Sequence, residues 1–204
     1  AILTKAIAYI YLAPVLLVFG LAVLFQALKN RQWKFIYKCL ILFVAVLLIN
    51  GGFFYRNFTL SGNFLGTTRE EYHLYINEEH TPSALASNIT RNIALHYGVP
   101  FFSGVAEKTV KMMHIWIGQE QNDPKTTFDY VKEFKVKPYG TLEDYGANII
   151  QVSMILIIFI SFLLFPGKMQ KTILFYFLLI ISMFLLFCFY LKWQPWHSRL
   201  DTPL

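Results

Sequence analysis

Four long, nearly uninterrupted apolar runs constrain the fold of this chain more than any other feature. A helix of about 20 apolar residues crosses the ~30 Å hydrocarbon core of a bilayer. The runs are Ala6 to Leu28, Cys39 to Tyr55, Ala147 to Phe165 and Thr172 to Leu191. They lie in two pairs on either side of one long polar stretch. The sequence therefore predicts an all-α membrane protein with four transmembrane helices, arranged as two hairpins around a mainly helical extracytoplasmic segment with minor strand or irregular content.

This pattern divides the chain into four predicted parts. Residues 1–56 form a first transmembrane hairpin, residues 57–146 the extracytoplasmic segment and residues 147–192 a second hairpin. Residues 193–204 form an outer motif rich in Trp, His and Arg. The hydrophobic content of 56% and the mean hydropathy of +0.47 are too high for a soluble domain of 204 residues.

The distribution of charge predicts how the chain crosses the membrane. The charged residues of the two short connections are all basic: Lys29, Arg31, Lys34, Lys38, Lys168 and Lys171. Short loops rich in Lys and Arg stay on the cytoplasmic side, which places the large segment and both chain ends outside. Residues 56–146 hold nine basic and eleven acidic residues, so the formal net charge of +6 does not indicate a nucleic-acid partner.

Local signals predict helices within the polar segment. A Thr-Pro start and a one-sided apolar pattern predict an amphipathic helix over residues 82–97. Ser103 is a candidate cap of a second helix that ends near Gly118. Residues 62–66 contain two glycines and an asparagine, which favour a tight turn. For residues 69–77, the sequence does not decide between a short strand and an irregular arm.

Few residues have the spacing that catalysis or metal binding requires. The five histidines show no close pairing with other ligand residues, and both cysteines lie in or at the edge of apolar runs. The chain also lacks a nucleophile elbow and a phosphate-binding Gly-rich loop. We therefore predict no metal site and no cofactor, and the sequence identifies no catalytic residue.

The remaining candidates are polar and aromatic residues near the outer membrane surface. Arginine binds phosphate well because its planar guanidinium donates two parallel hydrogen bonds. Four of the candidates also have a structural interpretation. Arg56 and Arg199 are candidate lipid head-group anchors, Arg91 a solvated flank of its helix and Asp144 a partner of the helix dipole. Both interpretations stay open. The candidate substrate-binding residues are Arg56, Arg91, Asp144, Trp196, His197 and Arg199.

Four strings together resemble a family of membrane enzymes. The strings are Arg56-Asn57 with residues 62–66 (GNFLG), residues 122–127 (NDPKTT), residues 143–148 (EDYGAN) and residues 193–200 (WQPWHSRL). They resemble the polyprenyl-phosphate-sugar-dependent glycosyltransferases of the GT-C type, the group of protein O-mannosyltransferases and aminoarabinose transferases. The chain is similar to an interior or C-terminal part of a bacterial multi-pass member.

The resemblance implies a location, partners and a reaction. The expected location is the bacterial cytoplasmic membrane, and the expected partners are the lipid bilayer, a polyprenyl-phosphate sugar donor and the remainder of a longer polytopic chain. A sugar would be transferred with inversion to an acceptor hydroxyl. Arg199, with Arg56 and Arg91, would stabilise the leaving phosphate, while His197 and Trp196 would shape the site.

One feature of the family pattern is missing from this sequence. In the family the catalytic acid lies in the first outer loop, whereas here a basic inner connection joins the first two spans. The catalytic acid therefore cannot be assigned to any residue of this chain. The alternative function is a non-catalytic, membrane-anchored binding or interaction module. A transporter is ranked last, because the four apolar runs hold no ionisable residue at their centres.

Overall fold

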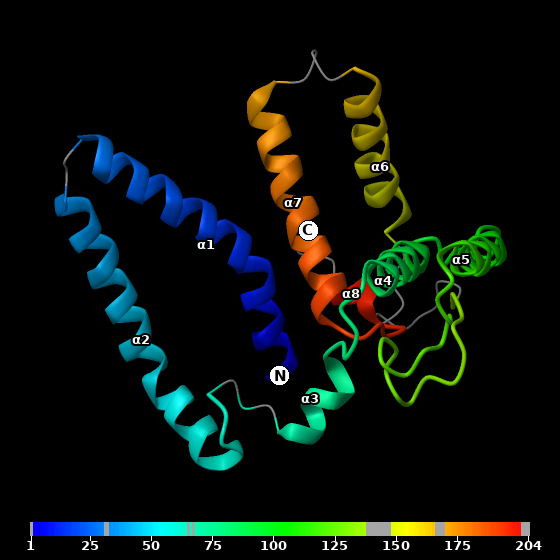
Figure 1. Ribbon diagram of the computed structural model, residues 1–204, viewed down its shortest axis with the longest axis horizontal. Helices are drawn as coiled ribbons and strands as arrows, with labels where there is room; N and C mark the ends of the chain where they lie inside the picture. The colour runs from blue at the N-terminus through cyan, green and yellow to red at the C-terminus, as the bar shows by residue number, and fades with distance from the viewer. Residues whose placement is uncertain are drawn as a thin grey trace. The chain divides into compact units, whose positions relative to one another are not determined.

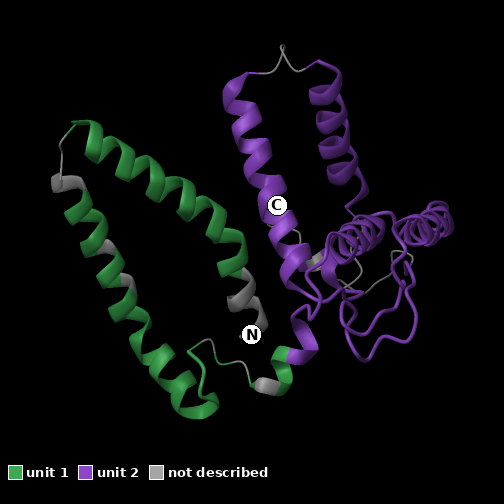
Figure 2. Ribbon diagram, viewed as in Figure 1, with its two compact units in different colours: residues 1–72 green, residues 73–204 purple. Residues whose placement is uncertain are grey.

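The computed structural model describes residues 2–30, 33–64, 66, 68–137, 148–165 and 170–200. These residues form helices and irregular segments, with two isolated β-bridges and no β-strand among them. They divide into two compact units, residues 1–72 and residues 73–204 (Figures 1 and 2). The predicted all-α class is confirmed, and the predicted minor strand or irregular content is present among the described residues as irregular segments.

Unit 1 consists mainly of two long apolar helices, α1 (Ile2–Asn30) and α2 (Trp33–Ser61), which contact each other. Each helix has 29 residues. Gly62 and Gly66, which follow α2, have φ values of 69° and 79°. This left-handed conformation favours glycine because a Cβ would clash with the backbone. The predicted turn at residues 62–66 is therefore supported by both of its glycines.

Helix α3 (Arg69–Tyr75) lies where the sequence left a strand and an irregular arm open. A reciprocal capping box starts it. The Thr68 N–H donates to Glu71 Oε2 at 2.9 Å, and the Glu71 N–H donates to Thr68 Oγ1 at 3.2 Å. Two of the N–H groups that a helix start leaves unsatisfied are paired in this way, which stabilises the helical alternative. Both sequence interpretations of residues 69–77 were therefore wrong over most of their length.

Three of the described helices are long and apolar enough to cross a membrane. They cover Ala8–Asn30, Ile36–Ser61 and Lys171–Tyr190. The remaining apolar helix, α6 (Ile149–Leu164), has 16 residues and rises roughly 24 Å at 1.5 Å per residue. This rise is shorter than a typical hydrocarbon core of ~30 Å. The structure is thus compatible with an integral membrane protein, with three spans supported by helix length and the fourth predicted from sequence.

Helix α4 (Pro82–Leu95) is central to unit 2. It packs against α5 (Ser103–Ile117), α7 (Lys171–Tyr190) and α8 (His197–Leu200). Thr81 Oγ1 caps α4 by accepting from the Ala84 N–H at 3.2 Å, as the sequence predicts. The second predicted helix is also present. However, Ser103 is its first helical residue instead of its cap, and Gly118 ends it with a φ of 66°.

The segment after α7 joins three distant parts of unit 2. The Lys192 N–H donates to the Tyr75 carbonyl at 2.9 Å, and the Trp193 N–H donates to the Thr126 carbonyl at 2.8 Å. The Phe128 N–H donates back to the Trp193 carbonyl at 3.0 Å. These bonds hold residues 191–194 between the end of α3 and the segment that follows α5. The indole of Trp193 then fills the hydrophobic core, together with Ala94, Leu95, Val110, Phe134 and Val136.

Candidate functional site

A layer of buried polar side chains lies between α4, the carboxyl end of α7 and α8. It contains two of the predicted site residues, Arg91 and His197. A third predicted residue, Trp196, lies outside the layer and packs edge-on against Phe128, with ring centroids 5.2 Å apart. Arg56 belongs to unit 1. The side chain of Arg199 and all of Asp144 lie outside the described residues. We call this group the buried polar layer, and its members are Asn77, Asn88, Arg91, Asn92, Thr126, Thr127, Gln194 and His197.

Arg91 is fully buried, which contradicts the solvated flank suggested by the sequence. Its Nη1 donates to Thr127 Oγ1 at 2.6 Å and to the Gln121 carbonyl at 2.9 Å. Its Nη2 donates to Asn88 Oδ1 at 2.6 Å and to the Thr126 carbonyl at 3.2 Å. Burial lowers the pKa of Arg91 to about 9, so the guanidinium remains charged at neutral pH. These contacts already use most of its donors, which argues against Arg91 as a phosphate ligand.

Two asparagines bind the carboxyl end of α7. Asn77 Nδ2 donates to the carbonyls of Cys188 and Phe189 at 3.1 and 2.8 Å. Asn88 Nδ2 donates to the Cys188 carbonyl at 2.9 Å, while its Oδ1 accepts from Arg91. The last carbonyls of a helix lack partners within the helix and carry its negative dipole end. The Asn88 amide therefore connects the buried cation to the negative end of α7.

His197 is fully buried and neutral. Its Nδ1 lies 2.9 Å from Asn92 Oδ1, and since an amide oxygen only accepts, the ring proton is on Nδ1. Burial, with a smaller effect of the Arg91 charge, lowers the pKa of His197 to about 3. The ring also packs edge-on against Phe187 at 4.7 Å. A neutral, enclosed imidazole does not supply positive charge to a phosphate, so His197 acts here as a structural link between α8 and α4.

Several polar atoms of the segment 193–197 have no hydrogen-bond partner among the described residues. They are Trp193 Nε1, both amide atoms of Gln194 and His197 Nε2. A buried polar atom that stays unsatisfied costs about 1–3 kcal/mol.

A serine–histidine pair connects α4 and α5. His114 Nδ1 donates to the Val110 carbonyl at 2.8 Å, so Nε2 accepts from the Ser87 hydroxyl, also at 2.8 Å. A hydrogen bond of this kind can activate a serine nucleophile. Here Ser87 is fully buried, and burial also lowers the pKa of His114. A substrate has no access to this hydroxyl, and the pair holds the two helices together.

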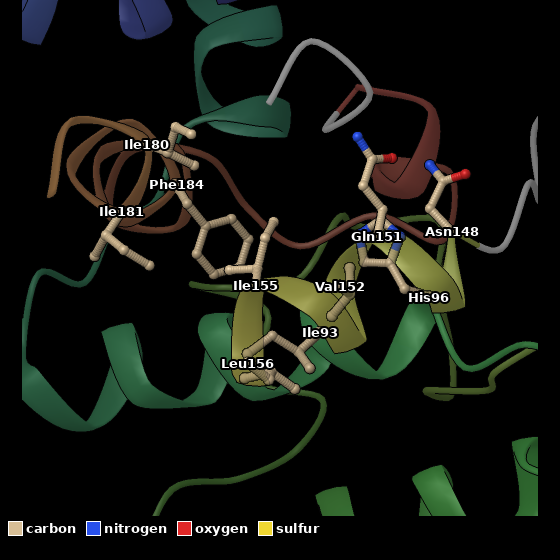
Figure 3. Close-up of a pocket in the computed structure, with 10 residues that line it drawn as sticks. All are labelled: Ile93, His96, Asn148, Gln151, Val152, Ile155, Leu156, Ile180, Ile181 and Phe184. Carbon is tan, nitrogen blue, oxygen red and sulfur yellow. The ribbon is translucent and has the colours of Figure 1, made fainter. Parts of the chain in front are cut away.

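A cavity of unit 2 lies between α4, α6 and α7 and has a volume of about 110 Å³. Most of its wall is aliphatic or aromatic. Three polar residues, His96, Asn148 and Gln151, gather at one end of it, while Ile155, Phe184 and the α7 isoleucines form the other end (Figure 3). Its lining residues are Ile93, His96, Asn148, Gln151, Val152, Ile155, Leu156, Ile180, Ile181 and Phe184. We call this cavity the amphipathic pocket.

The polar end of the amphipathic pocket coincides with the start of α6. Asn148 precedes the first helical residue, and its side chain makes no capping hydrogen bond. The N–H groups of a first helical turn point out of the helix and favour a negatively charged group. Gln151, one turn later, adds an amide that can donate as well as accept. The pocket thus combines an apolar interior with a polar, anion-favouring end.

A second, more polar pocket in unit 1 contains Arg56. It is lined by Phe53, Arg56, Asn57, Leu60, Ser61, Gly66, Thr68 and Glu71. The guanidinium of Arg56 is exposed, and its surroundings include the carboxylate of Glu71. This carboxylate would compete with a phosphate for Arg56, so the arrangement fits a head-group anchor at least as well as a phosphate site.

The described residues contain no group of three or more His, Cys, Asp or Glu side chains that could hold a metal ion. Comparison with known protein families, with curated proteins and with solved structures finds no match for this chain. The arrangement of side chains therefore carries the functional argument.

Sequence reasoning missed the residues that line the amphipathic pocket and most of the buried polar layer. One signal was present for the layer: Asn88, Arg91 and Asn92 recur at spacings of three and four, which places them on one face of α4. For the pocket, Asn148 and Gln151 lie at the edge of an apolar run and are the polar residues of its first turn. Neither signal predicts which part of the chain these polar residues contact.

Proposed function

We propose that this chain is a membrane-anchored binding module for an amphiphilic lipid with an anionic head group, bound in the amphipathic pocket. The observation that carries the proposal is the segregation of the pocket into an aliphatic interior and a polar end (Figure 3). Ligand sites commonly combine a mainly apolar wall with a few convergent polar groups that orient the ligand.

The aliphatic part of the pocket suits a branched hydrocarbon chain. Ile155 on α6 and Ile180 and Ile181 on α7 face it with branched side chains, and Phe184 adds a ring. Both helices are apolar along their length, so lipid chains of the bilayer surround them. A hydrocarbon chain can therefore enter the pocket from the bilayer without crossing water.

The polar end suits a phosphate or a similar anion. It contains the amino terminus of α6, whose dipole favours negative charge, and the amide of Gln151. His96 adds a ring that can donate one hydrogen bond in its neutral form. A polyprenyl phosphate, the lipid implied by the sequence resemblance, has this combination of a branched chain and an anionic head.

A photoreactive polyprenyl phosphate probe tests the binding. The full chain in proteoliposomes is expected to be labelled on α6 or α7. Ile155→Trp fills the pocket and should lower the labelling at least fivefold. Ile157→Trp is the matched control, because Ile157 is 61% exposed and is not part of the pocket wall.

Two further probes define the ligand class. Replacing Gln151 by leucine should reduce the preference for polyprenyl phosphate over the uncharged polyprenol. Ordinary phospholipid and unlabelled polyprenyl phosphate are compared as competitors of the labelling. If both compete equally, the pocket is a lipid-filled crevice without selectivity. Unchanged labelling of a folded Ile155→Trp variant would overturn the proposal.

Glycosyl transfer is the second candidate function. One observation supports it: two of the strings that carry the resemblance, residues 122–127 and residues 193–200, lie side by side through the Thr127–Trp193 bridge. In this version the pocket holds the polyprenyl chain of a sugar donor and a carboxylate elsewhere accepts the proton of the acceptor hydroxyl.

Sugar transfer from a labelled polyprenyl-phosphate sugar would distinguish the two functions. The intact protein in its native membrane is expected to catalyse the transfer, and Ile155→Trp and Arg199→Ala should both reduce it. Specific labelling of the pocket without any sugar transfer would exclude the transferase function and support the binding module. Normal transfer by Arg199→Ala would exclude a role for this arginine.

A further inference from the structure

Helix α4 has the opposite polarity to a helix at the surface of a soluble domain. Its polar residues Ser87, Asn88 and Arg91 are fully buried. Its apolar stripe, formed by Leu85, Ile89 and Ile93, is only partly covered. A surface helix in water normally buries the apolar stripe and exposes the polar one. The exposed part of this stripe therefore suits an environment less polar than water.

Helix α5 also presents apolar side chains outward. Val105, Met112, Ile115 and Trp116 are 59%, 54%, 71% and 75% exposed. The side of α5 that faces α4 is formed around Val110 and His114, which are buried. Phe101 in the preceding turn is also exposed. Exposed apolar groups in this number on one short element mark an interaction surface.

An apolar groove joins the outer surfaces of the two helices. It is walled on one side by Thr90, Ile93 and Tyr97 of the α4 region, and on the other by Val105, Thr109 and Met113 of α5. Ile93 also lines the amphipathic pocket. Ile93 of α4 therefore contributes to both the groove and the pocket.

The charges on α5 are those of a helix that meets anionic lipid. Lys108 and Lys111 are exposed. The single acidic residue of α5, Glu107, is turned inward and accepts from the Val136 N–H at 2.8 Å. Basic residues beside an exposed apolar face are typical of helices that lie in the membrane interface. Lysine side chains there extend their charged ends to the lipid phosphates.

The direction of the helices agrees with this environment. α4 and α5 run across the direction of α6 and α7 (Figure 1). α4 lies beside the ends of those helices at Ile149 and Tyr190, and α5 packs against α4. If α7 crosses the bilayer, its carboxyl end reaches the membrane surface there. Two helices that cross it at this level lie in the plane of the interface.

From these observations we infer that α4 and α5 form an interfacial platform, with the exposed face of α5 inserted among the lipids of the leaflet where α7 ends. The bilayer is the partner of this surface. The buried polar layer stabilises the platform from within, because it ties α4 to the carboxyl end of α7. The inference does not depend on what occupies the amphipathic pocket.

Spin labels on single added cysteines test the location of α5 in proteoliposomes. Labels at Met112→Cys and Trp116→Cys should be accessible to dissolved oxygen and shielded from a water-soluble nickel chelate. A label at Lys132→Cys, an exposed residue of the polar segment, should show the reverse. Signal from the native Cys39 and Cys188 is measured in protein without an added cysteine.

A charge on the apolar face provides the second measurement. Trp116→Glu should withdraw α5 from the lipid and raise the nickel accessibility of a label at residue 112 severalfold. Lys132→Glu, the matched control, should leave that accessibility unchanged.

Three outcomes would overturn the inference. Labels at residues 112 and 116 that are open to the nickel chelate from the start would place α5 in water. Labels shielded from both reagents would indicate a protein partner. Labels that become accessible as the protein is diluted with lipid would indicate a second copy of this chain.

Discussion

Arg91 keeps a positive charge in the interior although no carboxylate pairs with it among the described residues. Its charge is compensated by the carbonyl oxygens of Gln121 and Thr126 and by the ring of Trp193, whose centroid lies 5.4 Å from Cζ. Asn88 adds the link to the negative end of α7. Several partial negative charges can stabilise a buried cation in this way, although a buried charge without compensation would be very costly.

Arg91→Met should destabilise unit 2 strongly. The substitution removes the cation and leaves Asn88 Oδ1, Thr127 Oγ1 and the Gln121 carbonyl without the donor that Arg91 supplies. The Thr126 carbonyl keeps the bond from the Trp193 N–H. Unsatisfied buried groups of this kind suggest a loss on the order of 3 kcal/mol. Thermal unfolding in detergent measures the loss, with Lys132→Met at an exposed position as the control.

Arg91→Lys should rescue little of the lost stability, because lysine has no planar fork to reach all these acceptors. A lysine variant as stable as the native chain would show that charge alone matters at this position.

The depressed pKa of His197 makes stability depend on pH. In the unfolded chain this histidine binds a proton below about pH 6.5, whereas in the folded chain it does so only near pH 3. Between these values the unfolded state binds more protons, so stability is full above pH 6.5 and falls as the pH falls. The loss between pH 7.5 and pH 5 should be on the order of 2 kcal/mol.

Unfolding of His197→Asn at both pH values tests this assignment. Asparagine does not titrate, so the stability difference between pH 7.5 and pH 5 should shrink in this variant. His114, whose pKa is also lowered, should account for part of the remainder. A variant with the full native difference would assign the pH dependence to other groups.

At the scale of single residues, sequence reasoning selected several residues that lie in the site but predicted the wrong environment for them. Arg91 and His197 were singled out by their chemistry, yet both expectations for Arg91 placed it at the surface. Its burial depends on Thr126 and Thr127, which contact it only after α4 packs against the segment that follows α5. A side chain of this length can reach water or the interior from the same helix position, so local sequence does not decide between them.

The carboxyl end of α7 depends on side chains from outside the helix. Asn77→Ala removes the bonds to the Cys188 and Phe189 carbonyls. The last turn of α7 should then open more often, and stability should fall by about 1–3 kcal/mol. Hydrogen exchange of residues 187–191 measures the opening. Glu133→Gln is the control, because it breaks an exposed ion pair with Lys135 far from α7 in the sequence. Exchange in Asn77→Ala that is as slow as in the native chain would contradict the capping role.

Helix existence was predictable where local signals agreed. Thr81-Pro82 and the one-sided apolar pattern gave α4, and Gly118 gave the end of α5. Residues 69–77 were misjudged because the capping box at Thr68 and Glu71 outweighs the aromatic and β-branched residues that favour a strand. The polarity of α4 was misjudged for a different reason. An apolar stripe faces the least polar neighbour available, and the sequence does not say whether this neighbour is a protein core or a lipid.

For the molecule as a whole, the basic connections predict that both short loops face the cytoplasm. A membrane-impermeant maleimide applied to intact cells should label Tyr130→Cys in the large segment and leave Lys38→Cys unlabelled. Opening the cells should make residue 38 reactive, and protein without an added cysteine sets the background of Cys39 and Cys188. Labelling of residue 38 from outside would reverse the predicted topology.

The sequence by itself determined that the chain is mainly helical and that its long apolar runs are compatible with membrane spans, because run length and hydropathy are properties of local composition. It also determined the Thr81 cap of α4, the end of α5 at Gly118 and the turn at residues 62–66, since these depend on residues close to each other in the sequence. Only the tertiary structure decided which polar groups are buried and where a pocket forms. Those features depend on α4, α6, α7 and the segment after α7 meeting in space, and the free energy of a buried Arg91 or an exposed Trp116 is set by the partners that this packing supplies.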